Sequence, residues 1–210
     1  MITDYTTLQD AVASYLKRSD LAGDIPLLIQ LAESRLNRDI KSPRNLQEHV
    51  GTLTSHYFAF PVLFLPQEGK FKEIKKLSIT YGGRDYVLSP LTSNQAVNIS
   101  DVTPPRGYYV QGSNIYVVGG NGDENYSLVA EMTLPEIASA VNGYTNWVLQ
   151  KAPELYLYAT LLESAPFIKN DARIQVWAEG YRAALSTLNE QEERLTRGPG
   201  VRIKPVHYAP

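Results

Sequence analysis

The chain has 210 residues, of which 43% are hydrophobic and 20% charged, so it can build one good core or two small ones and is too apolar for intrinsic disorder. With a formal net charge of −2, the protein does not have the strongly positive surface field of proteins that bind nucleic acid through the phosphates. The absence of cysteine excludes disulfides, thiolate metal sites and a cysteine nucleophile.

The N-terminal segment does not have the pattern of a targeting or membrane segment. "MITDYTTLQD" has no basic stretch leading into an apolar one. The longest apolar run, "FAFPVLFL", is split by a proline and is too short to span a bilayer. We therefore expect a protein that is made in a cytoplasm and has no membrane partner.

Two amphipathic helices are predicted near the N-terminus. "TTLQDAVASYLKR" opens on a capping box, in which the Thr6 hydroxyl accepts from the backbone N–H of Gln9. "GDIPLLIQLAESRLNRDI" has Asp24 as its expected cap and Pro26 in its first turn, where the missing N–H costs nothing. The stripes expected to face each other in this αα-hairpin are Leu8, Val12, Tyr15 and Leu16 on the first helix and Leu28, Leu31, Arg35 and Leu36 on the second.

A β region is predicted from Leu46 to about Thr133, because the hydrophobic pattern there alternates residue by residue. The expected strands are Glu48–Thr54, Lys72–Thr80, Tyr86–Ser89, Tyr108–Val110, Ile115–Val118 and Tyr126–Met132. "YGGR" predicts a two-residue hairpin, since Gly82 and Gly83 can supply the positive φ angles of a type I′ turn, and "QGSN" predicts a second turn. The lysines of "KFKEIKK" are typical of a strand with one solvated face or a charged edge.

Helical periodicity returns from about Thr145. "TNWVLQKA" predicts a short helix, and "PELYLYATLLESAPFIKND" predicts a helix that starts at Pro153 and kinks or ends at Pro166. That second helix is apolar on nearly every side, so protein must enclose it. The last helix, "DARIQVWAEGYRAALSTLNEQEERL", has Asp171 as its expected cap and Gly180 as its weak point. Its apolar face is Ile174, Trp177, Tyr181, Leu185, Leu188 and Leu195.

Tyrosine is unusually frequent, with 14 copies. Tyrosine is enriched at protein interfaces, where its ring packs while its hydroxyl stays hydrated. Neighbouring copies of the chain could therefore enclose part of the helical bundle, and ordinary core positions are the alternative. The candidate interface residues are Tyr15, Tyr156, Tyr158, Trp177 and Tyr181.

No local motif indicates an enzyme. "GGNGDEN" lacks the Lys-Ser/Thr of a P-loop and lies between two predicted strands, which favours a hairpin loop. Glu163, on the largely apolar helix, could serve as a general acid, but the sequence supplies no partner carboxylate. An ion pair with Arg35 or Arg173 is the favoured interpretation. The three histidines are widely spread and do not indicate a metal site, so we expect no catalytic residue, metal or cofactor.

The C-terminal end, "TRGPGVRIKPVHYAP", predicts an extended arm, because its glycines and prolines cannot continue a helix. From Arg194 onward the chain is basic and carries no acid. We expect the arm to dock into a groove of a partner protein as an added strand or extended segment, with a disordered end as the alternative. The residues expected to make this contact are Arg197, Val201, Arg202, Ile203, Lys204, Val206 and Tyr208.

Together these elements predict an α+β fold. We expect a helical bundle formed by the N- and C-terminal segments, residues 1–45 and 134–195. An antiparallel β insertion would occupy residues 46–133, and the extended C-terminal arm would occupy residues 196–210.

The helical segments at the two ends of the chain resemble the head-to-tail adaptor proteins of tailed phages, especially the adaptor family of short-tailed phages. The resemblance rests on the order and spacing of "TLQDAVASYLKRSDLAGDIPLLIQLAESRLNRDI" and "NWVLQKAPELYLYATLLESAPFIKNDARIQVWAEGYRAALSTLN". Between them, "YYVQGSNIYVV" resembles the usual hairpin of the family. The resemblance implies a structural virion protein without shared catalytic residues.

The same resemblance implies a ring of about twelve copies that docks under the portal after DNA packaging and joins the capsid to the tail. Its partners would be the portal protein and a distal tail component, either a nozzle or a tail-tube protein. DNA would pass through the lumen without sequence-specific binding, and the protein would lie at the head–tail junction of the virion.

Two other functions stay open on the sequence. One is a phage-borne cell-wall glycan hydrolase, with Glu163 as its first catalytic candidate. The other is a monomeric ligand-binding module, which predicts a deep apolar pocket in the β region.

Overall fold

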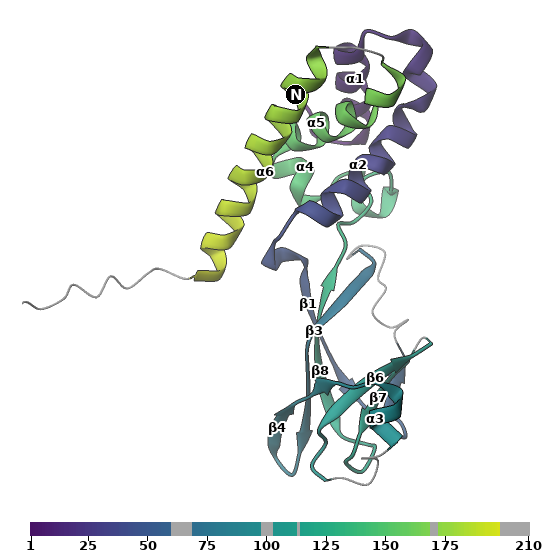
Figure 1. Ribbon diagram of the computed structural model, residues 1–210, viewed down its shortest axis with the longest axis vertical. Helices are drawn as coiled ribbons and strands as arrows, with labels where there is room; N and C mark the ends of the chain where they lie inside the picture. The colour runs from purple at the N-terminus through teal and green to yellow at the C-terminus, as the bar shows by residue number, and fades with distance from the viewer. Residues whose placement is uncertain (60–68, 98–102, 113, 169–171, 198–210) are drawn as a thin grey trace, which may run out of the picture. The chain divides into compact units, whose positions relative to one another are not determined.

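The computed structural model describes residues 1–59, 69–97, 103–112, 114–168 and 172–197. It has the predicted α+β fold, with helices from both ends of the chain and, between them in sequence, one antiparallel and one mixed sheet (Figure 1). The chain divides into two compact units. Residues 1–8 and 44–150 make up the first, named here the β unit, and residues 9–43 with those described from 151 onward make up the second, the helical unit.

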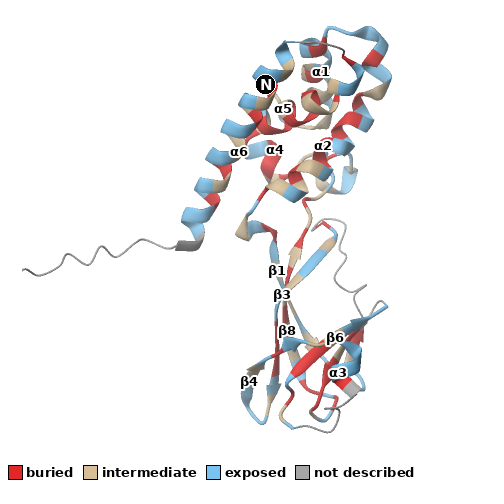
Figure 2. Cartoon of the chain, viewed as in Figure 1, coloured by how far each residue is buried: buried red, intermediate tan, exposed pale blue. Residues whose placement is uncertain are grey.

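The helical unit is built around α5 (Pro153–Glu163). Both α2 (Ile25–Asp39) and α6 (Arg173–Arg197) pack against it (Figure 1). Buried residues take up most of the circumference of α5, which is largely red in Figure 2, and they are Leu155, Tyr156, Leu157, Ala159, Thr160 and Leu161. The predicted central helix is confirmed, and it ends before Pro166, which lies in the 3₁₀ turn η5 (Ala165–Phe167).

The start of α1 (Tyr5–Leu16) differs from the prediction. The Asp4 carboxylate accepts from the Thr7 backbone N–H at 2.9 Å, and the Thr7 hydroxyl accepts from the Asp4 N–H at 3.0 Å. The reciprocal cap is therefore the pair Asp4 and Thr7, and the expected pair Thr6 and Gln9 was wrong. An aspartate that lies one turn before Thr7 brings a stronger acceptor to the same free N–H groups.

The start of α2 also differs in part. The 3₁₀ turn η1 (Ser19–Asp24) runs directly into α2, so Asp24 already has helical φ and ψ and makes no side-chain cap. Pro26 lies in the first turn, as predicted. The cap expected for α6, Asp171, lies outside the described residues.

The buried stripe of α2 is turned relative to the prediction. Ile25, Leu28, Ala32 and Leu36 are buried, whereas Leu31 is 42% exposed. Spacings of three and four are both compatible with one helical face, and the sequence alone did not decide which leucines share the inner side. On α1 the predicted stripe Leu8, Val12 and Leu16 is buried, and Tyr15 is outside it.

The β unit contains two four-stranded sheets. The first has the order β1 (Leu46–Thr52), β8 (Asn125–Met132), β3 (Phe71–Tyr81), β4 (Arg84–Val87), and all its pairs are antiparallel. The second has the order β2 (Tyr57–Ala59), β7 (Asn114–Val118), β6 (Gly107–Gln111), β5 (Ser89–Pro90). In this second sheet only β5 and β6 are parallel.

The hairpin between β3 and β4 forms where the sequence predicted it. Tyr81 pairs with Arg84, and Gly82 and Gly83 have φ angles of 57° and 76°. These positive values are the ones a type I′ turn requires. Gln111 likewise pairs with Asn114 across the second predicted turn.

Short elements of the β unit were not predicted. They are β2, β5 and the one-turn helix α3 (Ser93–Val97). Each is too short to show a periodic pattern. The predicted short helix after the sheets is α4 (Trp147–Lys151).

The core of the β unit lies between the two sheets. Strands of both sheets contribute its buried side chains, Leu53, Phe58, Leu77, Ile79, Leu88, Tyr108, Ile115, Val117, Leu128, Ala130 and Met132. The Phe58 ring stacks on Tyr126 with 4.0 Å between the ring centroids. This arrangement is typical of two sheets packed face to face.

Candidate assembly surfaces

A polar network joins α2, α5 and α6 inside the helical unit. Arg35 Nε donates to Glu163 Oε1 at 2.6 Å, and the Arg35 guanidinium lies 5.9 Å from the centroid of the Tyr181 ring. The Tyr181 hydroxyl donates to Asp39 Oδ2 at 2.6 Å. Burial and the hydrogen bond to Asp39 raise the pKa of Tyr181 well above its usual value. The network fixes the direction in which the outer faces of α2 and α6 point.

The same contacts establish that α2 and α6 run in the same direction. Tyr181 contacts Asp39, whose backbone oxygen accepts from Asn189 Nδ2 at 3.2 Å. One turn further along α6, Glu192 accepts from the Ser42 hydroxyl at 2.6 Å. Residue numbers therefore increase together along the two segments, which makes the pair parallel.

Glu192 is the most buried acid of α6, with no exposed surface. Its carboxylate accepts from Lys151 Nζ at 2.6 Å as well as from Ser42. Ser42 and Lys151 lie beside two of the three places where the chain passes between the helical unit and the β unit, at residues 43–44 and 150–151. The carboxylate thus joins α6 to the two segments of the helical unit that precede residue 44 and follow residue 150.

The residues predicted as a subunit interface have different positions. Tyr156, Trp177 and Tyr181 are buried among the helices of this one chain. Tyr158 is half-buried, and its ring lies against Gly180, where an added Cβ would be 2.8 Å from Cε2. Tyr15 is 49% exposed, and its carbonyl accepts from Arg173. For all five residues, contact with a second copy stays a prediction, and Tyr15 is the most accessible of them.

Exposed apolar side chains of the helical unit lie at positions that the sequence did not single out as surface. Leu27 and Leu31 are 50% and 42% exposed on α2, and Val176 is 63% exposed on α6. Leu27 and Leu31 lie opposite the buried face of α2, and Val176 lies at the side of the buried face of α6. The signal was present in the spacing of Leu27 and Leu31, but the same spacing also fits a core stripe.

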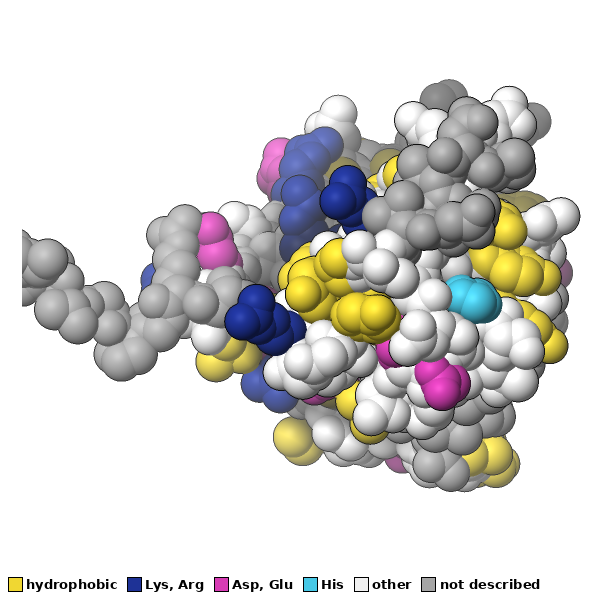
Figure 3. Space-filling model, turned by 90° about the horizontal axis from the view of Figure 1, so that it is seen from below, with side chains coloured by type: hydrophobic (Ala, Val, Ile, Leu, Met, Phe, Trp, Pro, Cys, Tyr) yellow, Lys and Arg dark blue, Asp and Glu magenta, His cyan; other side chains and the backbone are white. Residues whose placement is uncertain are grey.

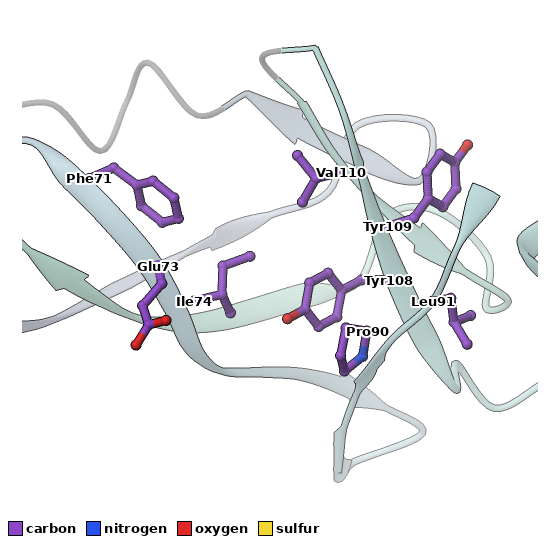
Figure 4. A pocket seen from close by; sticks show the side chains of 8 residues that line it. All are labelled: Phe71, Glu73, Ile74, Pro90, Leu91, Tyr108, Tyr109 and Val110. Carbon is purple, nitrogen blue, oxygen red and sulfur yellow. The ribbon is translucent and has the colours of Figure 1, made fainter.

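The β unit has a groove with a volume of about 440 Å³. It lies beside β3, β5 and β6, where Tyr108 and Val110 point toward Phe71 and Ile74 while Tyr109 points away (Figure 4). β4 pairs only with residues 78–81 of β3, and β5 pairs only with residues 107 and 108 of β6. Among the described residues, parts of both longer strands thus have no strand partner on the side of this groove. Most of the side chains that line the groove are apolar.

The charged residues predicted along β3 lie in a mixed cluster. Lys72 and Lys75 both donate to Glu131, each at 2.7 Å, and Lys70 donates to Glu136 at 2.7 Å. Figure 3 shows one face of the molecule, on which Lys and Arg side chains gather beside hydrophobic ones. Because acids of β8 and its following loop neutralise much of this charge, the strand does not form a strong phosphate-binding patch.

The residues considered above for catalysis or phosphate binding make structural contacts. Glu163 forms the ion pair with Arg35 that the sequence favoured. In the "GGNGDEN" loop, Glu124 is buried and accepts from the backbone N–H groups of Asn121 and Gly122, so a carboxylate occupies the place that a phosphate would need. The described ranges contain no group of three or more His, Cys, Asp or Glu side chains placed to hold a metal ion. No helix in the described part of the chain is long and apolar enough to cross a membrane.

The predicted C-terminal arm, residues 196–210, lies outside the described residues except for Thr196 and Arg197. Arg197 is the last residue of α6, and the other predicted contact residues, Val201, Arg202, Ile203, Lys204, Val206 and Tyr208, lie outside the described residues. The contact of the arm with a partner therefore stays a prediction.

Comparison with known proteins agrees with the resemblance seen in the sequence. No curated protein matches the chain. A model of the family described as SU10 adaptor protein matches residues 3–203, which include the helices of both ends and the β region between them. Because the match covers nearly the whole chain, this protein belongs to the SU10 adaptor protein family.

Proposed function

We propose that this phage adaptor protein is a structural subunit of a ring that docks under the portal and joins the capsid to the tail after DNA packaging. One observation carries the proposal: a braced helical unit presents exposed apolar residues on two different helices, Leu27 and Leu31 on α2 and Val176 on α6. A closed ring needs two different surfaces on each subunit, because the front of one copy meets the back of the next. A ring of about twelve copies is the expected size.

The two ends of the assembly would use the other parts of the chain. The arm residues Arg197, Val201, Arg202, Ile203, Lys204, Val206 and Tyr208 would contact the portal protein. The β unit would contact the distal tail component, a nozzle or tail-tube protein. Its groove at β3 and β6 supports this role, because uncovered strands can accept an extended segment of a partner.

DNA would cross the lumen without sequence-specific contacts. The net charge of −2 and the neutralised lysines of β3 support this, because tight phosphate binding would hinder the passage of a genome. The role is structural rather than catalytic, at the head–tail junction of the virion.

The test is the molar mass in solution, measured by light scattering on a sizing column. The full-length protein is run alone and then mixed with purified portal rings of the same phage. We expect a ring-sized assembly in at least one of the two runs, with many copies bound to each portal. A 23.4 kDa monomer that does not bind the portal would contradict the proposal.

A further inference from the structure

The exposed side of α2 carries one continuous stripe. Leu27, Leu31, Ser34 and Arg38 follow one another at helical spacings of four, three and four, and all four are exposed. We name these residues the α2 stripe. Arg38 makes no ion pair among the described residues, so its charge faces solvent at the C-terminal end of the stripe.

The exposed side of α6 carries a second stripe of different chemistry. Its residues, all exposed, are Val176, Glu179, Ala183 and Glu190. Ala183 lies two turns after Val176, and Glu190 lies two turns after Ala183. We name these residues the α6 stripe. It combines a small apolar surface with acidic residues, one of which, Glu190, lies toward the C-terminal end.

We propose that the α2 stripe of one copy packs against the α6 stripe of the next copy and so closes the ring. The occupant of each stripe is thus a second copy of this chain. The inference rests on the proposed ring function and goes beyond it by naming the two surfaces. Leu27 and Leu31 would cover Val176 and Ala183, and Arg38 would pair with Glu190.

The spacing of apolar and charged residues supports this register. Arg38 lies about nine residues beyond the midpoint of Leu27 and Leu31, and Glu190 lies about ten beyond the midpoint of Val176 and Ala183. At 1.5 Å per residue, the two charges would then be offset by only about 2 Å along parallel helices.

The direction of the helices is also compatible. Within one chain α2 and α6 run in the same general direction (Figure 1), and the contacts of Asp39 and Ser42 with α6 agree with this. Neighbours in a ring of about twelve differ by a rotation of only about 30°. α2 of one copy therefore stays close to parallel to α6 of the next, whatever the direction of the ring axis.

Engineered cysteines test the contact directly, because the natural chain has none. Full-length Leu31→Cys and Ala183→Cys are mixed in equal amounts, under the conditions in which light scattering detects a ring-sized mass, and oxidised. We expect a covalent dimer on a non-reducing gel, since facing Cβ atoms of packed helices approach disulfide distance. Leu31→Cys alone and Leu31→Cys mixed with Arg182→Cys are the controls, because Arg182 is exposed on α6 outside the stripe.

Charge reversal tests the predicted ion pair. Arg38→Glu and Glu190→Arg should each weaken subunit association about tenfold, because each puts like charges face to face. The double variant Arg38→Glu/Glu190→Arg should recover most of the loss. Arg182→Glu makes the same charge change off the stripe and should leave association unchanged.

The outcomes separate this inference from the function on which it rests. A ring-sized mass without the disulfide, or one whose stability Arg38→Glu does not alter, would mean that other surfaces close the ring. A wild type that forms no ring, alone or with portal, would instead overturn the proposed function. Disulfide formation together with rescue by the double variant would establish the two stripes as the ring interface.

Discussion

Tyr181 combines a buried ring with a hydroxyl that donates to the Asp39 carboxylate at 2.6 Å. Tyr181→Phe keeps the ring and removes the donor, which leaves a partly buried carboxylate without this hydrogen bond. We expect a loss of about 1–3 kcal/mol in the free energy of unfolding, measured by urea denaturation. Tyr15→Phe is the control, since Tyr15 is half exposed, and should change stability by less than about 0.5 kcal/mol.

The same tyrosine predicts a dependence on alkaline pH. Burial and the hydrogen bond to Asp39 raise the pKa of folded Tyr181 above the value of 10.0 in an unfolded chain. The unfolded chain therefore loses this proton first, and the stability contribution present below pH 10.0 is lost as the pH rises through the folded pKa. The wild type should lose stability above that pH faster than Tyr181→Phe. Parallel curves for the two proteins would show that this proton is not linked to folding.

Gly180 interrupts the sequence of α6 but not the helix. An added Cβ would lie 2.8 Å from the Tyr158 ring of α5, so the glycine permits the close approach of the two helices. Gly180→Ala should lower the free energy of unfolding by about 1–2 kcal/mol, although alanine is the better helix former by about 1 kcal/mol. Gly23→Ala, where no atom lies within 4 Å, should be close to neutral. A stabilising effect of Gly180→Ala would show that propensity outweighs packing here.

At the scale of elements, the buried Glu192 carboxylate joins α6 to the segments that precede and follow residues 44–150, through Ser42 and Lys151. Glu192→Gln replaces the charge that Lys151 and Ser42 face by an amide of similar shape. Because Lys151 is partly exposed, we expect a loss of about 2 kcal/mol rather than the full cost of an isolated buried charge. Chemical denaturation measures it. Lys151→Met/Glu192→Leu should recover much of the loss, whereas equal losses in the single and double variants would argue against a specific pair.

The elements that the sequence predicted are those with a long or strongly marked pattern. α2, α5 and α6 have helical periodicity over several turns, and the Gly82 and Gly83 turn has a local cause that does not depend on the rest of the fold. β2 and β5 exist because longer strands lie beside them, so no local signal marks them. The cap of α1 was placed at Thr6 because a hydroxyl and an amide fit the capping pattern, whereas Asp4 forms the better cap.

The candidate site was predicted less well than the fold, for a physical reason. Tyrosine and tryptophan are typical of both interfaces and cores, and only packing separates the buried Tyr156, Trp177 and Tyr181 from the exposed Tyr15. Leu31 was assigned to the core because a leucine at helical spacing usually faces inward. The rotation of α2 about its axis depends on α5, and that contact cannot be read from the α2 sequence alone.

At the scale of the whole molecule, the proposed assembly assigns a different task to each part of the chain. The helical unit would form the ring, the β unit would meet the distal tail component, and the arm would contact the portal. The polar network of Arg35, Glu163, Asp39 and Tyr181 belongs to the first task, because a ring can close only if each subunit keeps the same angle between its two contact surfaces.

Deletion of the arm tests its proposed contact with the portal separately from the tasks of the other two parts. Removal of Gly198–Pro210 takes away no residue of α6 and none of the core residues found among the described part of the chain. The circular dichroism should therefore be unchanged, and the melting temperature should shift by no more than about 2 °C. Portal binding, measured by co-sedimentation with portal rings, should be lost. A full-length chain with Val201→Ser and Ile203→Ser keeps the length and the basic charge of the arm, and it should also fail to bind if the apolar side chains anchor the arm. Binding that survives the deletion would mean that the portal contacts the helical unit or the β unit, and the arm would then have no part in docking.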